Sequence, residues 1–552
     1  MKNIYTIILA LATAINLQAQ TPTWLWANRA GGVASEEGTA ITVDVLGNTY
    51  ITGVFSGPTC SFGTTTLTNV SFTDIFIAKY DASANLVWAK SAGGLGYDQS
   101  TSIAVDTSGN VFVTGFFNSS TITFDTITLS TNAGYDMFIA KYNSNGNIIW
   151  AKNIGGASAD YSNSISVDSI GNSFITGYFK SASIQFGSTT LLNSTFAGSN
   201  YFVAKYNSFG NPVWAKAAVS GNVTGNSIKL GNNGNIFATG FFSGTAIFDT
   251  ITKNSIGSKD IFTSKYDSLG NVVWVKSIGG TNEEISYGIS TDGYNNSYIT
   301  GFFKSLNVTV GTTTFTNSGA PDGDILTVKY NNAGNVVWAK KGGNYSNALG
   351  LAIATDVIGN SYVTGNYRSG PLTFGSIVLN GPFAMTSVGD LFVVKYDSSG
   401  TPLWARNLLS STGARGSGIA LDNTGNCYLT GFFEDVTLAF DNTTLTNAGS
   451  QGSMEIFVGK LGPSSSVGIP QVNILDEFTL FPNPSTGIIF INLNNDSFSE
   501  ITITNILGEL IYKTTTKTQQ IELDLTNQPN GVYLIKMIDK NTNVTSKKII
   551  KQ

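Results

Sequence analysis

A tryptophan recurs along this chain at a nearly constant spacing, and this period limits the folds that the chain can adopt. The recurring residues are Trp26, Trp88, Trp150, Trp214, Trp274, Trp338 and Trp404, with steps of 62, 62, 64, 60, 64 and 66 residues. A period of this size indicates a repeat protein, in which each unit is a small supersecondary structure that is stable only against its neighbours.

Each unit contains four short segments with strand-forming composition. In the second copy they are residues 102–106, 111–117, 136–142 and 148–152, with turn clusters rich in Asp, Asn and Gly between the first pair and the second pair. A longer segment, 120–134, predicts a small additional hairpin, and Gly155-Gly156 opens the connection to the next copy. Seven copies of four antiparallel strands predict an all-β fold: a seven-bladed β-propeller with four-stranded antiparallel blades, over residues 20–461.

The phase of the repeat predicts how the ring closes. A fourth-strand element, residues 24–27, begins the repeats, whereas the seventh copy stops after its third strand at 456–460. We therefore expect the N-terminal strand to pair with residues 455–461, which would remove the exposed strand edges.

The two rims of the predicted propeller differ in sequence. Short turns of the type D-x-x-G-N join strands one to two and three to four, as at residues 106–110. The opposite rim receives the long segment and the Gly-Gly connection, where the copies differ most. A ligand site is therefore expected on this long-segment rim.

Composition and the N-terminus indicate an exported protein. Lys2, an apolar run over residues 4–15 and Leu17-Gln18-Ala19 predict a signal peptide, residues 1–19. A formal net charge of −5 and the lack of clustered Lys and Arg argue against nucleic-acid binding, and no later apolar run is long enough to predict a transmembrane segment. The two cysteines, Cys60 and Cys427, occupy different places in the repeat, so we expect unpaired buried thiols rather than a disulfide.

The repeat has a recognisable family pattern. Residues 93–115, with a glycine pair, an acid, I-A-V-D, a G-N turn and a final T-G, resemble the bacterial β-propeller repeat family described as seven-bladed. The fourth copy departs from this pattern, because Ser227-Ile228-Lys229-Leu230-Gly231 lacks the Asp and the preceding connection lacks the glycine pair. The resemblance implies a fold and no particular activity.

The C-terminal part follows a different pattern. Residues 462–475 have the composition of a linker, and residues 476–552 alternate apolar and polar residues as in a small Ig-like β-sandwich. This segment resembles the C-terminal sorting domain of the type IX (Por) secretion system of Bacteroidota. The landmark residues are Pro482, Asn483, Pro484, Gly487, Gly508, Gly531 and Tyr533. The resemblance implies contact with the secretion machinery, export through the periplasm, and either attachment to the cell surface or release.

The sequence offers little for catalysis. The chain has no histidine, which excludes the Ser-His-Asp triad and the commonest metal ligand. Asp74, Asp136, Asp260, Asp324 and Asp390 recur once per copy before the third strand, so they read as structural residues. We therefore expect no enzyme activity, no metal and no cofactor.

Acids in the connections before the first strand form the candidate binding rim. They are Glu36, Glu37, Asp98, Asp160, Glu283 and Glu284, and the fourth, sixth and seventh copies have no acid there. The simplest interpretation of these residues is solvated loop charge. The leading hypothesis is a non-catalytic binding protein for an extracellular glycan or protein. A polysaccharide-acting glycosidase or lyase and a structural adhesin are the alternatives.

Overall fold

The computed structural model describes most of the chain. The described residues are 21–193, 198–317, 319, 322–343, 347–368, 370–381, 388–450, 452–463, 478–493, 498–505, 509–515, 520–539 and 544–552. The predicted signal peptide, the predicted linker from residue 464 onward and Gly508 lie outside them. The chain divides into two compact units, Met1–Ser464 and Ser465–Gln552.

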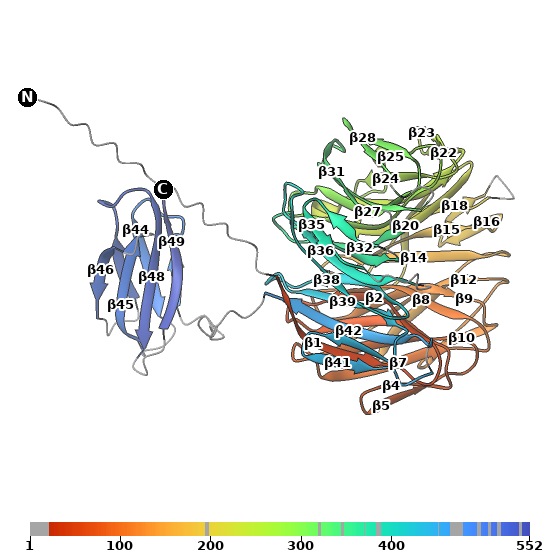
Figure 1. Cartoon of the computed structure of the whole chain (residues 1–552), viewed down its shortest axis with the longest axis horizontal. Helices are drawn as coiled ribbons and strands as arrows, with labels where there is room; N and C mark the ends of the chain where they lie inside the picture. The colour runs from red at the N-terminus through yellow and green to blue at the C-terminus, as the bar shows by residue number, and fades with distance from the viewer. Residues whose placement is uncertain are drawn as a thin grey trace, which may run out of the picture. The chain divides into compact units, whose positions relative to one another are not determined.

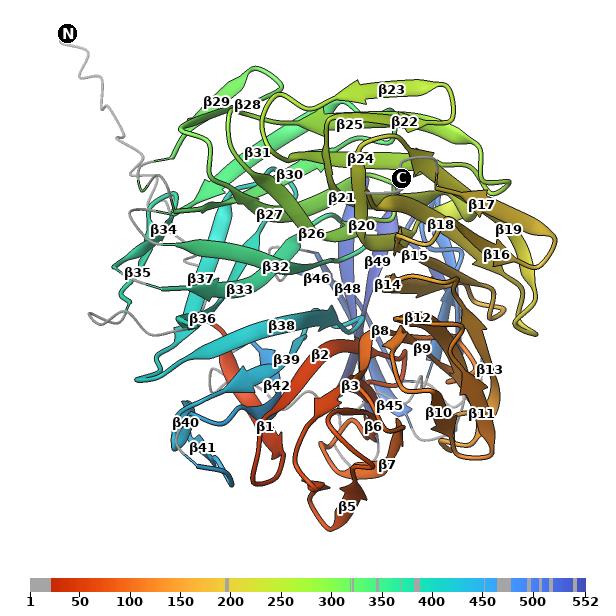
Figure 2. The same ribbon diagram turned by 90° about the vertical axis from the view of Figure 1, so that its right-hand side faces the viewer.

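The first unit is a propeller of seven antiparallel sheets arranged around a central channel, as predicted (Figures 1 and 2). In six blades the strand order follows the sequence, from the first strand at the channel to the fourth at the periphery, and in the seventh blade the fourth strand is the N-terminal β1. The first strands are β2 (Glu36–Val43), β8 (Asp98–Val105), β14 (Asp160–Val167), β20 (Asn222–Leu230), β26 (Glu284–Thr291), β32 (Ala348–Thr355) and β38 (Ala414–Leu421). The second strands are β3 (Thr49–Phe55), β9 (Val111–Phe117), β15 (Ser173–Phe179), β21 (Ile236–Ser243), β27 (Ser297–Phe303), β33 (Ser361–Tyr367) and β39 (Cys427–Phe433).

The outer half of each blade carries the tryptophan. The third strands are β6 (Asp74–Tyr80), β12 (Asp136–Tyr142), β18 (Asn200–Tyr206), β24 (Asp260–Tyr266), β30 (Asp324–Tyr330), β36 (Asp390–Tyr396) and β42 (Glu455–Gly462). The fourth strands are β7 (Leu86–Gly93), β13 (Ile148–Ile154), β19 (Pro212–Val219), β25 (Val272–Ile278), β31 (Val336–Gly342), β37 (Pro402–Leu408) and β1 (Thr23–Ala30). A 3-10 turn, η1 (Asn232–Gly234), replaces the Asp turn of the fourth blade.

The ring closes as the phase of the repeat predicts. Strand β1 pairs antiparallel with β42, from Thr23 opposite Gly462 to Ala30 opposite Ile456, and so completes the sheet β1-β42-β39-β38. The N-terminal strand therefore supplies the outer strand of the last blade (Figure 1).

The long segment of each blade forms the predicted extra hairpin. Three of these hairpins extend the sheet of the preceding blade, and the other four are separate two-stranded sheets. Strand β10 pairs with β7, β22 with β19, and β34 with β31. The hairpins are β4 (Thr59–Phe62) with β5 (Thr65–Thr68), β10 (Thr121–Phe124) with β11 (Ile127–Ser130), β16 (Ser183–Phe186) with β17 (Thr189–Leu192), β22 (Thr245–Phe248) with β23 (Ile251–Asn254), β28 (Asn307–Val310) with β29 (Thr313–Thr316), β34 (Leu372–Phe374) with β35 (Ile377–Leu379), and β40 (Thr437–Phe440) with β41 (Thr443–Thr446). The hairpins that are not paired in this way still contact the fourth strand of the preceding blade, so each hairpin bridges two blades.

The second unit is a small β-sandwich. One sheet has the order β43 (Phe478–Phe481), β44 (Ile488–Leu493), β47 (Gln520–Asp524), and the other has the order β46 (Leu510–Thr514), β45 (Phe498–Asn505), β48 (Gly531–Asp539), β49 (Val544–Lys551). Its core includes Ile489, Ile503, Leu523 and Ile535. Among the described residues of both units, no helix is long and apolar enough to cross a membrane.

Candidate functional site

The short-turn rim is occupied by contacts that hold neighbouring blades together. The Asp106 carboxylate accepts hydrogen bonds from the backbone N–H groups of Ser108 and Asn110, both at 2.9 Å, which fixes the turn. The Lys141 ammonium lies 4.9 Å from the centre of the Phe112 ring and donates to the Ser208 carbonyl of the next blade at 3.3 Å. Because equivalent contacts recur around the ring, this rim has mainly a structural role.

The opposite, long-segment rim contains a β-bulge in every first strand. In β2 the pairing with β3 skips from Gly38 to Ala40, and the same shift occurs in the other six first strands. A bulge leaves one residue unpaired and turns its side chain away from the regular pleat. The seven bulged residues are Thr39, Thr101, Asn163, Asn226, Tyr287, Leu351 and Ser417.

Some of these bulged residues form hydrogen bonds to the next blade. Thr101 donates to the Ser162 carbonyl at 2.8 Å, and Asn163 donates to the Gly225 carbonyl at 2.8 Å. On the other side of the channel, Tyr287 and Leu351 have no comparable bond among the described residues. All seven bulged side chains line a channel mouth of about 510 Å³, and the mouth is therefore built from unlike groups.

Charged residues lie on one side of this mouth. The Arg415 guanidinium pairs with the Glu37 carboxylate and lies 4.8 Å from the centre of the Phe432 ring. Arg368, which is exposed, also lines the mouth, and no ion pair of its side chain is found in the described part of the chain. The blade 6 and blade 7 side of the mouth is therefore cationic and polar.

An aromatic cleft lies on blades 1 to 3 at the same rim. It has a volume of about 350 Å³ and is lined by Val54, Thr73, Tyr97, Gln99, Phe116, Tyr135 and Tyr161. The rings of Tyr135 and Tyr161 stack with centroids 5.4 Å apart and planes inclined by 28°, and Phe116 meets the Tyr161 ring edge-on at 4.7 Å. None of the lining residues is charged, so the cleft is a neutral surface with aromatic faces.

The aromatic stack continues beyond the cleft. Tyr178 stacks on Tyr161 with centroids 4.9 Å apart, and Phe72 contacts Tyr97 at 5.0 Å. Burial, with the neighbouring Tyr161, raises the pKa of Tyr178 to about 12, so this phenol is protonated at physiological pH. Among the described residues, the hydroxyls of Tyr97, Tyr135 and Tyr161 have no hydrogen-bond partner. These hydroxyls are therefore open to a ligand.

The cleft is confined to blades 1 to 3 because the residues at the equivalent positions differ between blades. The residue two positions before each bulged residue differs in every blade: Glu37, Gln99, Tyr161, Thr224, Ile285, Leu349 and Arg415. The residue before each third strand also differs in nearly every blade: Thr73, Tyr135, Ser199, Lys259, Gly323, Gly389 and Met454. Positions that vary between copies therefore converge on the long-segment rim.

The acids proposed as a binding rim are distributed differently from the sequence expectation. Glu36, Asp98, Asp160 and Glu284 are fully buried at the starts of their strands, so they are not solvated loop charges. Asp160, for example, accepts hydrogen bonds from the Ser181 hydroxyl at 2.7 Å and from the Gly156 backbone at 2.9 Å. Burial raises the pKa of Glu36 to about 7 and that of Asp98 to about 6.

The two remaining acids reach solvent but are paired. Glu37 pairs with Arg415 in the channel mouth, and Glu283 pairs with Lys259 at 2.8 Å and with Lys304 at 3.0 Å. The aromatic residues of the cleft were not among the predicted site residues. Their signal was the presence of Tyr or Phe in columns of the repeat that hold other residue types in other copies.

The cysteines and the sorting residues are structural. Cys60 and Cys427 are buried free thiols, and burial raises the pKa of both. In the second unit, the Asn483 side chain donates to the Lys548 carbonyl at 2.7 Å and accepts from the Ile550 N–H at 2.8 Å, which ties the Pro482-Asn483-Pro484 segment to the last strand. The Tyr533 hydroxyl donates to the Pro529 carbonyl at 2.6 Å.

Two family models match the chain. Residues 479–552 match the model described as a secretion system C-terminal sorting domain, and residues 87–115 and 149–178 match the model described as a β-propeller repeat. The chain is a β-propeller with a secretion sorting domain. This confirms the resemblance to type IX-sorted propeller proteins of Bacteroidota and assigns the protein to the outer cell surface or the extracellular medium.

Individual relatives of this sorted propeller add little about function. A protein of Acanthamoeba polyphaga mimivirus, described as an uncharacterized WD repeat-containing protein, is 27% identical over 511 residues, which are 76% of this chain and 37% of that protein. The chain therefore spans little more than a third of that relative. Sqt1 from Chaetomium thermophilum is a similar solved structure, with 9% identity, a TM-score of 0.37, and coverage of 79% of this chain and 88% of Sqt1. PorZ, a surface component of the type IX secretion system of Porphyromonas gingivalis, has 10% identity and a TM-score of 0.16, with coverage of 95% and 100%.

Proposed function

We propose that the propeller is a non-catalytic binding module that presents its aromatic cleft to neutral carbohydrate outside the cell. The observation that carries the proposal is the stack of Tyr135, Tyr161 and Phe116 beside unpaired tyrosine hydroxyls. The C–H face of a sugar ring is flat and apolar and packs on an aromatic face, while its hydroxyl groups accept and donate hydrogen bonds. The size of the cleft, about 350 Å³, is that of a small-ligand site.

The surroundings of the cleft favour binding over catalysis. Glycoside hydrolysis ordinarily needs two carboxyl groups on either side of the scissile bond, and no residue that lines the cleft is acidic. Four buried acids are next in sequence to lining residues, and each accepts a hydrogen bond within the fold: Asp74 from the Val70 N–H, Asp98 from the Ser119 hydroxyl, Asp136 from the Asn132 N–H and Asp160 from the Ser181 hydroxyl. A charged polysaccharide is disfavoured because the lining offers no cation to pair with it.

The test is binding of the purified full chain to arrayed neutral and uronate-containing glycans, with Tyr161→Ala compared to Tyr294→Ala. Tyr294 is 72% exposed on the short-turn rim and serves as the matched control. Loss of one stacking face should weaken binding to the retained neutral glycan about tenfold, equivalent to about 1.4 kcal/mol, whereas Tyr294→Ala should bind like the wild type. Thermal unfolding of each variant checks that the fold is intact.

Two results would contradict the proposal. Retention of no neutral glycan, or equal retention by Tyr161→Ala and wild type, would remove the cleft as the binding site. Release of new reducing ends from a bound polysaccharide would favour the enzymatic alternative.

A further inference from the structure

An exposed pair of aromatic rings borders the aromatic cleft on the side of blade 1. The rings of Phe72 and Tyr97 lie with their centroids 5.0 Å apart and their planes inclined by 35°. Phe72 is 58% exposed and Tyr97 is 48% exposed, so both rings present surface to solvent. Tyr97 lines the cleft and Phe72 does not. The pair therefore carries aromatic surface from the cleft to a position outside it.

The backbone of Phe72 has a conformation that favours glycine. Its φ angle is +41°, in the left-handed region where the Cβ atom of other residues crowds the backbone. The second blade has Gly134, with φ +68°, at the same place two residues before the third strand. The Asn69 side chain donates to the Phe72 carbonyl at 3.2 Å and helps to fix this conformation. A bulky aromatic residue is thus kept at the expense of strain, which is characteristic of side chains with a function.

Neither aromatic residue is a feature of the repeat. Two residues before the third strand, where blade 1 has Phe72, the other copies have Gly134, Gly198, Ser258, Asp322, Val388 and Ser453. Four residues before the bulged residue, where blade 2 has Tyr97, the other copies have Ser35, Ala159, Asn222, Glu283, Asn347 and Gly413. The propeller fold therefore does not require an aromatic residue at either position.

Backbone contacts hold Tyr97 in place beside Phe72. The Tyr97 N–H donates to the Asn118 side-chain oxygen at 2.6 Å, and the Tyr97 carbonyl accepts from the Asn118 N–H at 3.1 Å. Thr73, which follows Phe72, forms a parallel β-bridge with Tyr97. Because these contacts fix the backbone on both sides of the pair, a ligand that packs on the rings has little backbone to order, which favours binding.

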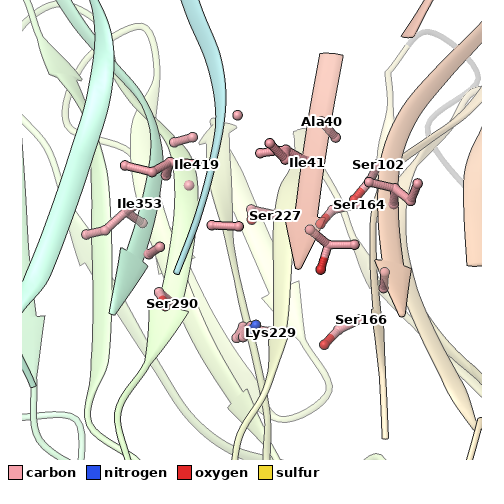
Figure 3. A pocket seen from close by; sticks show the side chains of 18 of the residues that line it. Ala40, Ile41, Ser102, Ser164, Ser166, Ser227, Lys229, Ser290, Ile353 and Ile419 are labelled. Atoms are coloured by element: carbon pink, nitrogen blue, oxygen red, sulfur yellow. The ribbon is translucent and has the colours of Figure 1, made fainter. Parts of the chain in front are cut away.

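The central channel has a different lining. Aliphatic and small hydroxyl side chains of the first strands predominate there, such as Ile353 and Ser164 (Figure 3). The Ser164 hydroxyl accepts from the Ile228 N–H at 3.2 Å, and the Ser227 hydroxyl accepts from the Ile289 N–H at 3.3 Å. These hydroxyls thus take part in contacts between blades. We therefore expect an extended neutral ligand to lie along the rim rather than inside the channel.

We propose that Phe72 and Tyr97 form a second aromatic subsite, so that the ligand is a linear glycan chain that lies across the cleft and this pair. The inference rests on the proposed function, because the cleft itself has to bind a neutral sugar. A short ligand occupies the cleft alone, whereas a longer chain reaches the Phe72 ring and gains a further stacking contact. Phe72 thus determines the preferred length of the ligand.

The test is isothermal titration of the purified full chain with linear oligomers of glucose, mannose and galactose, from the monosaccharide to the hexasaccharide. The wild type should bind the hexasaccharide of at least one series about tenfold more tightly than its disaccharide. Phe72→Gly should lose this difference and bind the disaccharide like the wild type. Because glycine relieves the left-handed strain, this variant should unfold at the wild-type temperature or above it.

Phe209→Gly is the matched control, because Phe209 is 77% exposed in a turn of the short-turn rim, and it should keep the length preference. Binding that Tyr161→Ala weakens but Phe72→Gly leaves unchanged at every length would keep the cleft and remove the second subsite. Absence of binding to every oligomer would remove both. A lower unfolding temperature of Phe72→Gly with unchanged binding would assign the ring to the fold. A wild-type dimer that Phe72→Gly dissociates in sedimentation velocity would assign the pair to contact between two copies of the chain.

Discussion

At the scale of single residues, the contact between a turn glycine and a tryptophan explains why both recur with the same period. Gly146 has φ +79°, and a Cβ atom there would lie 2.8 Å from the Trp88 ring of the preceding blade. The Trp88 indole N–H donates to the Ser144 carbonyl of the same turn at 3.1 Å. Gly210, Gly270, Gly334 and Gly400 repeat this arrangement. The turn thus needs glycine for its backbone conformation and for its closeness to the neighbouring blade.

This double requirement can be separated by two substitutions. Gly63 also has a positive φ, +57°, but a Cβ atom there would meet nothing within 4 Å. Gly63→Ala should lower the free energy of unfolding by about 1 kcal/mol through backbone strain alone. Gly146→Ala should lower it by about 1–3 kcal/mol more, because the methyl group overpacks against Trp88. Denaturant unfolding of both variants measures the difference, and equal losses would show that the Trp88 contact is not tight.

At the scale of elements, one carboxylate stabilises the position at which the N-terminal strand β1 completes the last blade. Asp441, in the turn of the hairpin β40–β41, accepts from the Trp24 backbone N–H at 2.8 Å and from two nitrogens of Arg406 at 2.5 and 3.1 Å. Arg406 also donates to the Pro22 carbonyl. Strand β1 is therefore held by its ladder with β42 and by this hairpin of the same blade.

Asp441→Asn tests the contribution of this carboxylate, and Asp125→Asn is its control at the same place in the second blade. Among the described residues, the partner found for the Asp125 carboxylate is Lys90, in a partly exposed ion pair at 3.5 Å. The Asp441 variant should lose about 1 kcal/mol of unfolding free energy, because a charge-assisted pair and a backbone bond are weakened. The Asp125 variant should stay within about 0.5 kcal/mol of wild type. Faster proteolysis near residue 23 in Asp441→Asn alone would support the assignment, and identical behaviour of the two variants would contradict it.

The strands and the closure could be predicted because they depend on the period and on turn residues, which are local features. The partner of each hairpin could not be predicted: β10 reads as an ordinary strand, and only the geometry of the ring brings it beside β7. The bulges at Thr39 and its equivalents also leave no sequence signal, since one unpaired residue does not disturb a short apolar pattern.

At the scale of the whole molecule, buried acids mark the junctions between blades. Asp74 starts the third strand of the first blade and Asp98 starts the first strand of the second blade, and the charge of Asp98 adds to the burial that raises the pKa of Asp74 to about 7. Glu455 has the same effect on Glu36, and Asp260 on Glu284. The adjacent pair Glu36-Glu37 shows why the sequence misled: successive strand residues face opposite sides, so one is buried and the other lines the channel mouth.

These acids make the stability of the propeller depend on pH in an unusual direction. A carboxyl group whose pKa is raised by folding holds its proton in the folded state at a pH where the unfolded chain is ionised. The folded state then binds more protons, so stability is complete near pH 4 and declines as the pH rises through about 6 to 7, the pKa values of Asp98, Asp390, Glu36 and Asp74. Below pH 4 stability falls as the pH falls, because folding lowers the pKa of Asp81, Asp267 and Asp441 and their protonation favours the unfolded chain.

We therefore expect the unfolding free energy to fall by at least about 2 kcal/mol between pH 5 and pH 8, since each unit of pKa shift corresponds to about 1.4 kcal/mol. Thermal or denaturant unfolding of the full chain across this range measures the slope. Asp98→Asn keeps the shape of the side chain and removes its ionisation, so it should flatten the slope. Asp81 lies in an exposed turn, and folding lowers the pKa of its carboxyl group. This carboxyl group is ionised in both states above pH 5, so Asp81→Asn should leave the slope between pH 5 and pH 8 unchanged. A propeller whose stability is constant or rises over this range would show that water or a cation reaches the junction acids and keeps them ionised.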